Sequence, residues 1–247
     1  MEPLVSTRIS LRWPPAAAEE HEDVLVVQGR SGFFLDLRVR RVAGQDRDFG
    51  GLEQSLAGET DVTWATAGWK SLLPPRNGEE HPRARFDAVL DSRSPAFSPH
   101  PSSSAAPPPP DGATPDEGSF EKLSNGDVLE RGEMLNPMTG TVQQYEEVWR
   151  RLPLLHDEGG GVRVLVLELV DEAEKGCVGR VGDWEVGLLD SAAGFGVVRR
   201  EKRAGEWAVV YQNGAGAALP SLEGVQAGEK GSIVQLGGRT WQVVESS

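Results

Sequence analysis

The chain has 247 residues, of which 38% are hydrophobic and 26% are charged, and its formal net charge is −13. This acidic balance repels the phosphates of nucleic acids and of anionic lipid surfaces, so it argues against both as partners. The length suits one large domain or two small ones.

The expected compartment follows from the N-terminal residues and from cysteine usage. Residues 1–15 lack the basic region and apolar core of a secretory signal, and no apolar run approaches the ~18–20 residues of a membrane span. The single cysteine, Cys177, excludes an intramolecular disulfide, which is typical of a reducing compartment. We therefore expect a cytoplasmic protein, with the nucleus as a second compartment.

The first elements in chain order are strands. Residues 5–13 alternate moderately and end at Pro14-Pro15, which indicates a strand stopped by proline. Residues 24–28 and 31–41 are predicted to form the two arms of a hairpin, with Gly29 and Gly32 at the turn between them. In its second arm, apolar side chains recur at every second position and predict one buried face. The members of this face are Phe33, Leu35, Leu37 and Val39, with Asp36, Arg38 and Arg40 between them.

Two further strands are predicted before the middle of the chain. Residues 60–66 are rich in β-branched and aromatic side chains, whereas residues 50–59 fit either a helical turn or a loop. Residues 84–92 alternate again. We expect Phe86, Ala88 and Leu90 to face one way in this strand.

A segment near the middle, SPHPSSSAAPPPPDGATPDEG at residues 98–118, has no periodic apolar pattern. Four consecutive prolines could bind an SH3 or WW domain as polyproline II. The flanks lack the basic residues that such a ligand carries, so the composition favours a disordered spacer. We expect a disordered loop over about 95–118.

The next elements are a hairpin and an ambiguous segment. Two short alternating segments flank Asn125-Gly126, which predicts a hairpin with a type I′ turn. Residues 141–152 fit a helix face through Val142, Tyr145 and Leu152. As a strand, the same residues would place Tyr145, Glu147 and Trp149 on one face. The turn-like residues before this segment and Pro153 after it favour a closing strand.

The second half has the most regular β pattern. Seven apolar segments follow residue 161 at about ten-residue spacing, with Gly, Asp or Asn at most junctions. This rhythm is typical of an antiparallel meander, sandwich or barrel. No helical pattern intervenes, so a parallel α/β sheet is not expected.

Four stretches resemble one known family. They are WATAG at 64–68, QYEEVWRRLP at 144–153, VLVLELVDEAEKGCVGRVGDWEVGLL at 164–189 and KGSIVQLGGRTWQVVE at 230–245. Together they resemble the fungal Hri family of small cytosolic proteins, named for interacting with a type I casein kinase. The resemblance implies an all-β fold of two tandem antiparallel lipocalin-like β-barrels.

The resemblance also implies the domain boundaries. It continues through residue 153, and a glycine-rich break follows at 156–161. We therefore expect barrels at 1–154 and 161–247. The Pro/Ser-rich loop then lies inside the first barrel, where a long insertion costs stability only logarithmically.

No catalytic, metal or cofactor site is predicted. The four histidines lie in polar or proline-rich surroundings, and a zinc site would need clustered Cys and His. Cys177 lies in an apolar strand and is expected to be a buried thiol rather than a nucleophile. With 38 acidic residues, adjacent carboxylates arise by chance. We therefore do not expect an enzyme.

Two sets of candidate site residues remain. Seven tryptophans could fill the barrels or line an apolar pocket, and the candidates for a pocket wall in the second barrel are Trp184, Trp207 and Trp241. Ser94 and Ser119 each follow an aspartate by three positions, which is a pattern that acid-directed kinases favour. We therefore treat both serines as candidate phosphorylation sites.

Two functions are compatible with these features. The first is a non-enzymatic interaction protein, an accessory partner of a type I casein kinase, with support from the family resemblance and the acidic surface. The second is a binder of a small apolar ligand inside a barrel. Barrel interiors filled by Phe, Leu and Trp side chains would remove the basis for the second.

Overall fold

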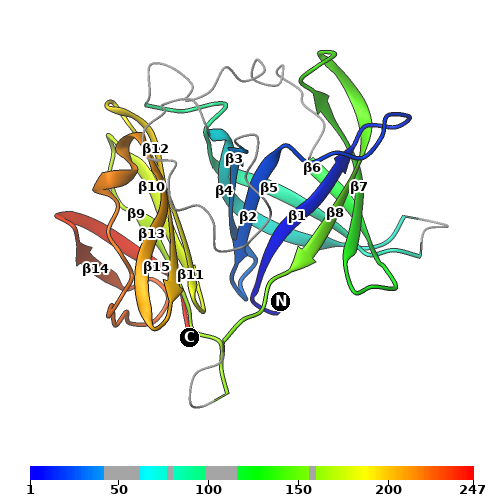
Figure 1. Cartoon of the computed structure of the whole chain (residues 1–247). Coiled ribbons are helices and arrows are strands. Elements are labelled where there is room, and N and C mark those ends of the chain that lie inside the picture. The colour runs from blue at the N-terminus through cyan, green and yellow to red at the C-terminus, as the bar shows by residue number, and fades with distance from the viewer. Residues whose placement is uncertain (42–61, 77–79, 98–115, 156–159) are drawn as a thin grey trace.

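The computed structural model describes residues 1–41, 62–76, 80–97, 116–155 and 160–247. Two β units lie side by side in it (Figure 1). The first is a closed barrel whose eight strands follow the chain order. These strands are β1 (Leu4–Arg12), β2 (Glu22–Gln28), β3 (Phe33–Arg40), β4 (Val62–Leu73), β5 (Arg83–Asp91), β6 (Asp116–Lys122), β7 (Val128–Asn136) and β8 (Thr141–Arg151).

The second unit is a seven-stranded sheet with the order β13-β12-β11-β10-β9-β15-β14. Its only described helical element is the short 3₁₀ helix η1 (Gly214–Ala218). Every strand pair in both units is antiparallel, so the predicted all-β class is confirmed. The strands are β9 (Val164–Leu169), β10 (Lys175–Val181), β11 (Trp184–Ser191), β12 (Gly194–Arg203), β13 (Glu206–Asn213), β14 (Ile233–Leu236) and β15 (Arg239–Ser246).

The ambiguous segment at 141–152 is the strand that closes the barrel. β8 pairs with β7 on one side and with β1 on the other, where Arg8 lies opposite Trp149. Tyr145, Glu147 and Trp149 share its inner face, as the strand interpretation predicts. The residues at 50–59, for which a turn or a loop is expected, lie outside the described residues.

The hairpin at Asn125-Gly126 is confirmed, but its predicted turn type is wrong. A type I′ turn needs positive φ at both central residues, and only Gly126 has it, at +90°. The loop is longer instead, with the Leu123 amide donating to the Asp127 carbonyl. The Asn125 side chain accepts a hydrogen bond from the Asp127 amide at 3.1 Å, which holds the longer loop.

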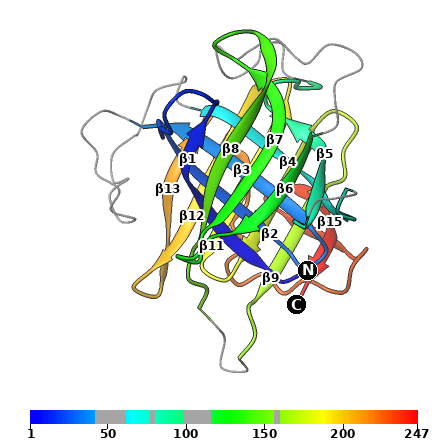
Figure 2. The same cartoon turned by 90° about the vertical axis from the view of Figure 1, so that its right-hand side faces the viewer.

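The apolar face of β3 is buried against the second sheet, outside the barrel. Phe33, Leu35 and Leu37 belong to a core that also contains Val166 and Leu188 of the neighbouring unit. Figure 2 shows the barrel strands crossing in front of that sheet. The contact between the two is close, because a Cβ atom added to Gly179 would collide with Leu35 Cδ1. The predicted period of two is therefore confirmed, and its apolar side forms the interface between the units.

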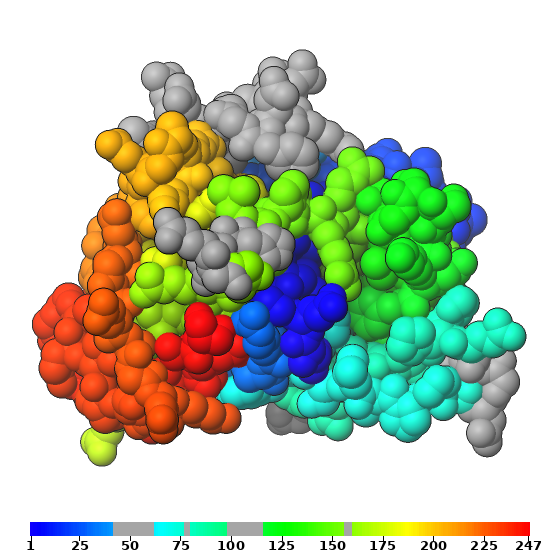
Figure 3. All heavy atoms as spheres, turned by 90° about the horizontal axis from the view of Figure 1, so that it is seen from below, coloured from blue at the N-terminus to red at the C-terminus, as the bar shows by residue number. Residues whose placement is uncertain are grey.

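Polar contacts join the same two units at the edges of this core. The Glu245 carboxylate accepts hydrogen bonds from the backbone amides of Arg30 and Ser31, both at 2.8 Å. The Arg199 guanidinium lies 2.9 Å from Asp23 Oδ2. Figure 3 shows the C-terminal residues against the β2–β3 turn on the underside of the molecule.

The second half differs from the predicted closed barrel. β13 and β14 are the two edges of the sheet, and among the described residues they do not pair with each other. The segment between them instead covers one face of the sheet, where Leu219 and Leu222 pack with the fully buried Trp241. Two side chains of the sheet bond the backbone of this segment. Arg200 donates to the Leu219 carbonyl at 2.8 Å, and Glu185 accepts from the Leu222 amide at 2.9 Å.

The predicted loop at about 95–118 lies mostly outside the described residues. Its two described ends are ordered, so the predicted boundaries are too wide. The amides of Ala96 and Phe97 donate to Asp190 Oδ2 of the second unit. At the other end, β6 begins at Asp116.

Candidate functional site: a polar and aromatic cavity in the first barrel

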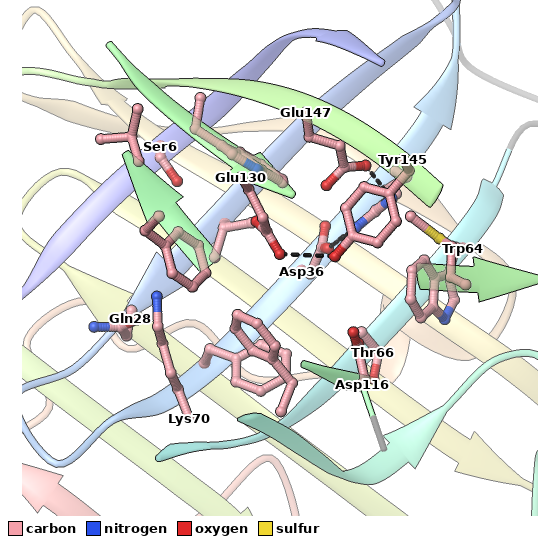
Figure 4. Close-up of a pocket in the computed structure, with 18 of the residues that line it drawn as sticks. Ser6, Gln28, Asp36, Trp64, Thr66, Lys70, Asp116, Glu130, Tyr145 and Glu147 are labelled. Atoms are coloured by element: carbon pink, nitrogen blue, oxygen red, sulfur yellow. Dashed lines mark hydrogen bonds and ion pairs between the residues drawn. The ribbon is translucent and has the colours of Figure 1, made fainter. Parts of the chain in front are cut away.

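The first barrel contains a cavity of about 1040 Å³ (Figure 4). All eight strands contribute side chains to its wall. Small-molecule sites in proteins commonly have volumes of ~300–1,000 Å³, so this interior is large enough for an organic ligand.

The inner face of the barrel carries charged side chains among its apolar and aromatic ones. On β3 the inner residues are Phe34, Asp36 and Arg38, which alternate with the apolar residues of the interface. A bulge where β4 pairs with β5 changes the orientation of the residues after Ala88. As a result Leu90 joins the interface core and Asp91 lines the cavity, so Leu90 does not share the face of Phe86 and Ala88 as expected.

One end of the cavity is aromatic. Phe86 meets Phe34 edge to face at a centroid distance of 5.5 Å, and its centroid lies 6.3 Å from that of Phe120. The Lys70 ammonium lies 4.4 Å from the Phe120 centroid and 5.2 Å from the Phe86 centroid. In Figure 4, Lys70 lies at the same end as Ser6 and Gln28. Burial lowers the pKa of Lys70, although the charge of Glu130 opposes this shift.

A buried charge cluster crosses the middle of the barrel. Arg8 Nη1 lies 2.6 Å from Glu147 Oε1, and Arg38 Nη2 lies 2.8 Å from Asp36 Oδ2. A weaker contact of 3.4 Å joins Arg38 to Glu147 and links the two pairs. Burial alone would lower the pKa of Arg38, but the charges of Asp36 and Glu147 outweigh it and raise that pKa. These arginines therefore stay charged in the interior.

Glu130 is a buried acid next to this cluster. It lies directly opposite Glu147 across β7 and β8, and the Tyr145 hydroxyl donates a hydrogen bond to its Oε1 atom at 3.0 Å. Burial, together with the negative charges of Glu147 and Asp116, raises the pKa of Glu130 to about 8. Glu130 is therefore mainly protonated at neutral pH.

Two facing glycines make room for Glu130 and Tyr145. Gly118 on β6 pairs with Gly132 on β7. A Cβ atom on Gly118 would lie 2.6 Å from Glu130 Oε1, and one on Gly132 would lie 2.6 Å from the Tyr145 hydroxyl. Side chains at these positions would displace both polar groups, so the glycines shape this part of the wall.

The opposite end of the cavity is built around Trp64. Its indole nitrogen donates to Asp91 Oδ1 at 2.9 Å. The Arg93 and Arg38 guanidinium groups lie over its ring at 4.0 and 4.4 Å from the centroid. Burial lowers the pKa of Arg93 to about 10. Asp116 lines the same end, and burial is the main cause that raises its pKa to about 6.

The arrangement is suited to holding an organic molecule that has both an apolar and a polar part. Within the described residues, no group of three or more His, Cys, Asp and Glu side chains is placed to hold a metal ion. Over the same residues, no helix is long and apolar enough to cross a membrane.

The three tryptophans proposed for a pocket wall are outside this cavity, whose tryptophans are Trp64 and Trp149. Trp241 is fully buried in the core of the second unit. Trp184 packs against the interface core, and the Arg180 guanidinium lies 5.1 Å from the Trp207 centroid. The pocket-wall prediction therefore does not apply to this cavity. Cys177 is a buried free thiol, as expected, and burial raises its pKa.

The two candidate phosphorylation sites differ in accessibility. Ser94 is exposed in a turn after β5, where its amide donates to the Asp91 carbonyl at 3.0 Å. Ser119 is half-buried in β6 and pairs with Arg83 on one side and Arg131 on the other.

The cavity residues were not predictable from one strand alone, because polar positions in a strand ordinarily face solvent. Asp36 and Arg38 lie between apolar residues at every second position, which is the pattern of a strand with one wet face. The signal that could have identified them is the large number of ionisable residues at such positions in several neighbouring strands.

Comparisons with known proteins give one family and one fold. A family model described as "Protein HRI1" matches residues 4–245. The crystal structure of an uncharacterized protein of Saccharomyces cerevisiae, YLR301w, superimposes with a TM-score of 0.71 at 19% identity, over 99% of each chain. At this identity the likeness shows the fold alone. No curated protein matches the chain.

Proposed function

We propose, from the premise that this chain belongs to the Protein HRI1 family, that its first barrel binds a small amphipathic organic molecule. The observation that carries the proposal is the cavity of about 1040 Å³ inside the barrel. A barrel interior that only stabilised the fold would be filled by side chains, since voids in protein cores are few and costly.

The chemistry of the wall supports a ligand with two kinds of surface. Phe34, Phe86 and Phe120 offer apolar contact area. Lys70, the Glu130–Tyr145 pair and Arg93 offer polar contacts at separate places. Small-molecule sites typically combine a mainly apolar wall with a few placed polar groups. The meander order of the eight strands is also that of lipocalins, and we propose a lipocalin-like mode of binding from it.

The direct test is native mass spectrometry of the protein purified from its own source, compared with an Ala88→Phe variant. Ala88 lines the cavity and is accessible, so a phenyl ring there occupies ligand space. We expect a ligand mass on the unmodified protein that is lost from the variant. The matched control is Ala208→Phe, on an exposed position of β13 outside the cavity. Equal ligand occupancy in all three proteins would contradict a site in this barrel.

The second proposed function is that of a non-enzymatic accessory partner of a type I casein kinase. It has support from the Hri-family resemblance and from the net charge of −13, which favours a partner with a basic groove. It is tested by affinity purification from a native extract with mass spectrometry. Recovery of the kinase supports the partnership, and its consistent absence from the recovered proteins counts against it. The cytoplasmic and nuclear location and the fungal origin stay predictions.

A further inference from the structure

Among the described residues, no carboxylate is in ion-pair contact with Lys70, a cation of the cavity, although the charge of Glu130 acts on it from further away. Lys70 is half-buried on β4, and its ammonium lies over the rings of Phe86 and Phe120 rather than beside an acid. Two other basic side chains of the wall are paired, Arg38 with Asp36 and Arg83 with Glu117. Keeping an unpaired cation away from water costs free energy, so a negative group bound here would compensate that cost.

Other donors converge on the same end of the barrel. Lys122 and Arg151 line the cavity there, and Arg151 is close enough for its charge to oppose protonation of Lys70. The Trp149 indole nitrogen is buried and has no hydrogen-bond acceptor among the described residues. Because buried donors are normally paired, this end lacks acceptor atoms that a ligand would bring.

Three acids of the cavity do not supply those acceptors. Asp36 and Glu147 are bonded to Arg38 and Arg8. Glu130 accepts from Tyr145, and its raised pKa keeps it mainly neutral at neutral pH. A neutral Glu130 does not repel an anion bound to Lys70, so the two groups are compatible with a negatively charged ligand.

An apolar lining surrounds the cationic end. Phe34, Phe86 and Phe120 are joined there by aliphatic side chains of neighbouring strands, namely Leu4, Val26, Leu72 and Val128. A ligand whose charged group met Lys70 would therefore lay an alkyl or aryl body on this surface.

We propose that the ligand of the first barrel is an amphiphilic organic anion, a carboxylate with an apolar alkyl or aryl body, whose head group pairs with Lys70. This inference rests on the proposed function, because it names the chemical class of the molecule that the cavity binds. The three phenylalanines contact the body, and the Trp149 indole donates to a carboxylate oxygen.

The test compares three probes of equal chain length, namely decanoate, decanol and decylamine. Each is titrated below its micelle concentration into the full chain at pH 7 by isothermal calorimetry. We expect decanoate to bind about ten-fold more tightly than decanol, which corresponds to ~1.4 kcal/mol for the charge pair. Decylamine is expected to bind most weakly, because its cation meets Lys70.

Two substitutions assign the effect to Lys70. Lys70→Met keeps an unbranched side chain without the charge, and we expect it to weaken decanoate binding about ten-fold while leaving decanol binding unchanged. Lys202→Met, at an exposed position of β12 outside the cavity, should change neither. A thermal melt checks folding, and Lys70→Gln replaces the first variant if it does not fold.

The outcomes separate the inference from the proposed function. If decanol binds but decanoate has no advantage, or if Lys70→Met leaves decanoate affinity unchanged, the anionic ligand is wrong and the binding function stands. Tightest binding of decylamine also overturns the anionic ligand. If none of the three probes binds, the anion proposal is wrong, and native mass spectrometry then decides whether the barrel binds any ligand.

Discussion

The hydroxyl of Tyr145 donates a hydrogen bond to Oε1 of Glu130, at 3.0 Å, between two neighbouring strands inside the first barrel. Both side chains are buried, and Gly118 and Gly132 leave the space that they occupy. An acid in this position is part of the cavity wall and also makes the fold sensitive to pH.

The first prediction concerns that sensitivity. The folded-state pKa of Glu130 is about 8, above its ordinary value of 4.5, so the folded protein holds this proton in a range where the unfolded chain has released it. The contribution of Glu130 to stability is therefore full below about pH 4.5 and is lost as pH rises to about 8. Glu130→Gln keeps an acceptor for Tyr145 and cannot ionise. We expect it to flatten the fall in stability between pH 5 and 8, as measured by urea unfolding.

The control for this prediction is Glu133→Gln, at a neighbouring position of β7 that also lines the cavity. It should reproduce the pH profile of the unmodified protein. If Glu130→Gln and the unmodified protein lose stability in parallel over this range, Glu130 is not the titrating group.

The second prediction tests the interface between the two units. In Gly179→Ala the new methyl group meets Leu35, which is fully buried, so we expect a loss of about 1–3 kcal/mol from overpacking. Leu35→Ala removes the obstructing atoms and leaves a cavity, at a cost of about 2–5 kcal/mol. In the double variant the methyl group fits, so its cost should be less than the sum by 0.5–3 kcal/mol, on the order of typical coupling energies. Strict additivity in denaturant unfolding would mean that the two residues are not in contact.

The third prediction concerns the charge cluster. Arg38→Met leaves the buried Asp36 carboxylate without its cation, and losing one partner of a buried pair typically costs about 3–5 kcal/mol. The loss should shrink at low pH, where Asp36 can bind a proton. Arg40→Met, at the exposed end of the same strand, should stay within about 0.5 kcal/mol of the unmodified protein. Equal unfolding free energies for the two variants would show that the Arg38 pair contributes nothing.

The fourth prediction concerns the candidate phosphorylation sites. A kinase needs an accessible segment, and Ser94 is exposed in a turn whereas Ser119 is paired on both sides within the barrel. After incubation with a type I casein kinase we expect phosphate on Ser94 and not on Ser119 in the folded protein. The Ser94→Ala variant should lose that phosphopeptide. Phosphate on Ser119 alone would contradict the predicted preference for Ser94. Phosphate on neither serine would show that neither is a site for this kinase.

The strands were predictable because each is a short local pattern. The segments at 5–13 and 31–41 and the seven of the second half correspond to strands, and the hairpin at Asn125-Gly126 is correct apart from its turn. The path of the second half was not predictable. The backbone of residues 219–222 is bonded by Arg200 and Glu185, which are distant in sequence. This loop covers one face of the sheet, and the predicted second barrel is an open sheet in the described residues.

The candidate site was the least predictable part. Aromatic side chains often line pockets, which favours Trp184, Trp207 and Trp241, yet these residues lie in the second unit, outside the cavity. Residues such as Lys70 and Glu130 resemble ordinary surface charges, because nothing in their local sequence shows that a closed barrel surrounds them.

Strand β3 shows which features follow from the sequence and which follow from the tertiary structure. The sequence by itself determined that Phe33, Leu35 and Leu37 share one face and that Asp36 and Arg38 share the other, because side chains along a strand alternate with a period of two. Only the tertiary structure decided which face is the barrel interior. A second sheet covers the outside of the barrel, so the apolar face points outward to it and the charged face lines the cavity. A period of two shows that the two faces of a strand differ. Which face lines the barrel interior depends on strands that are distant in the sequence.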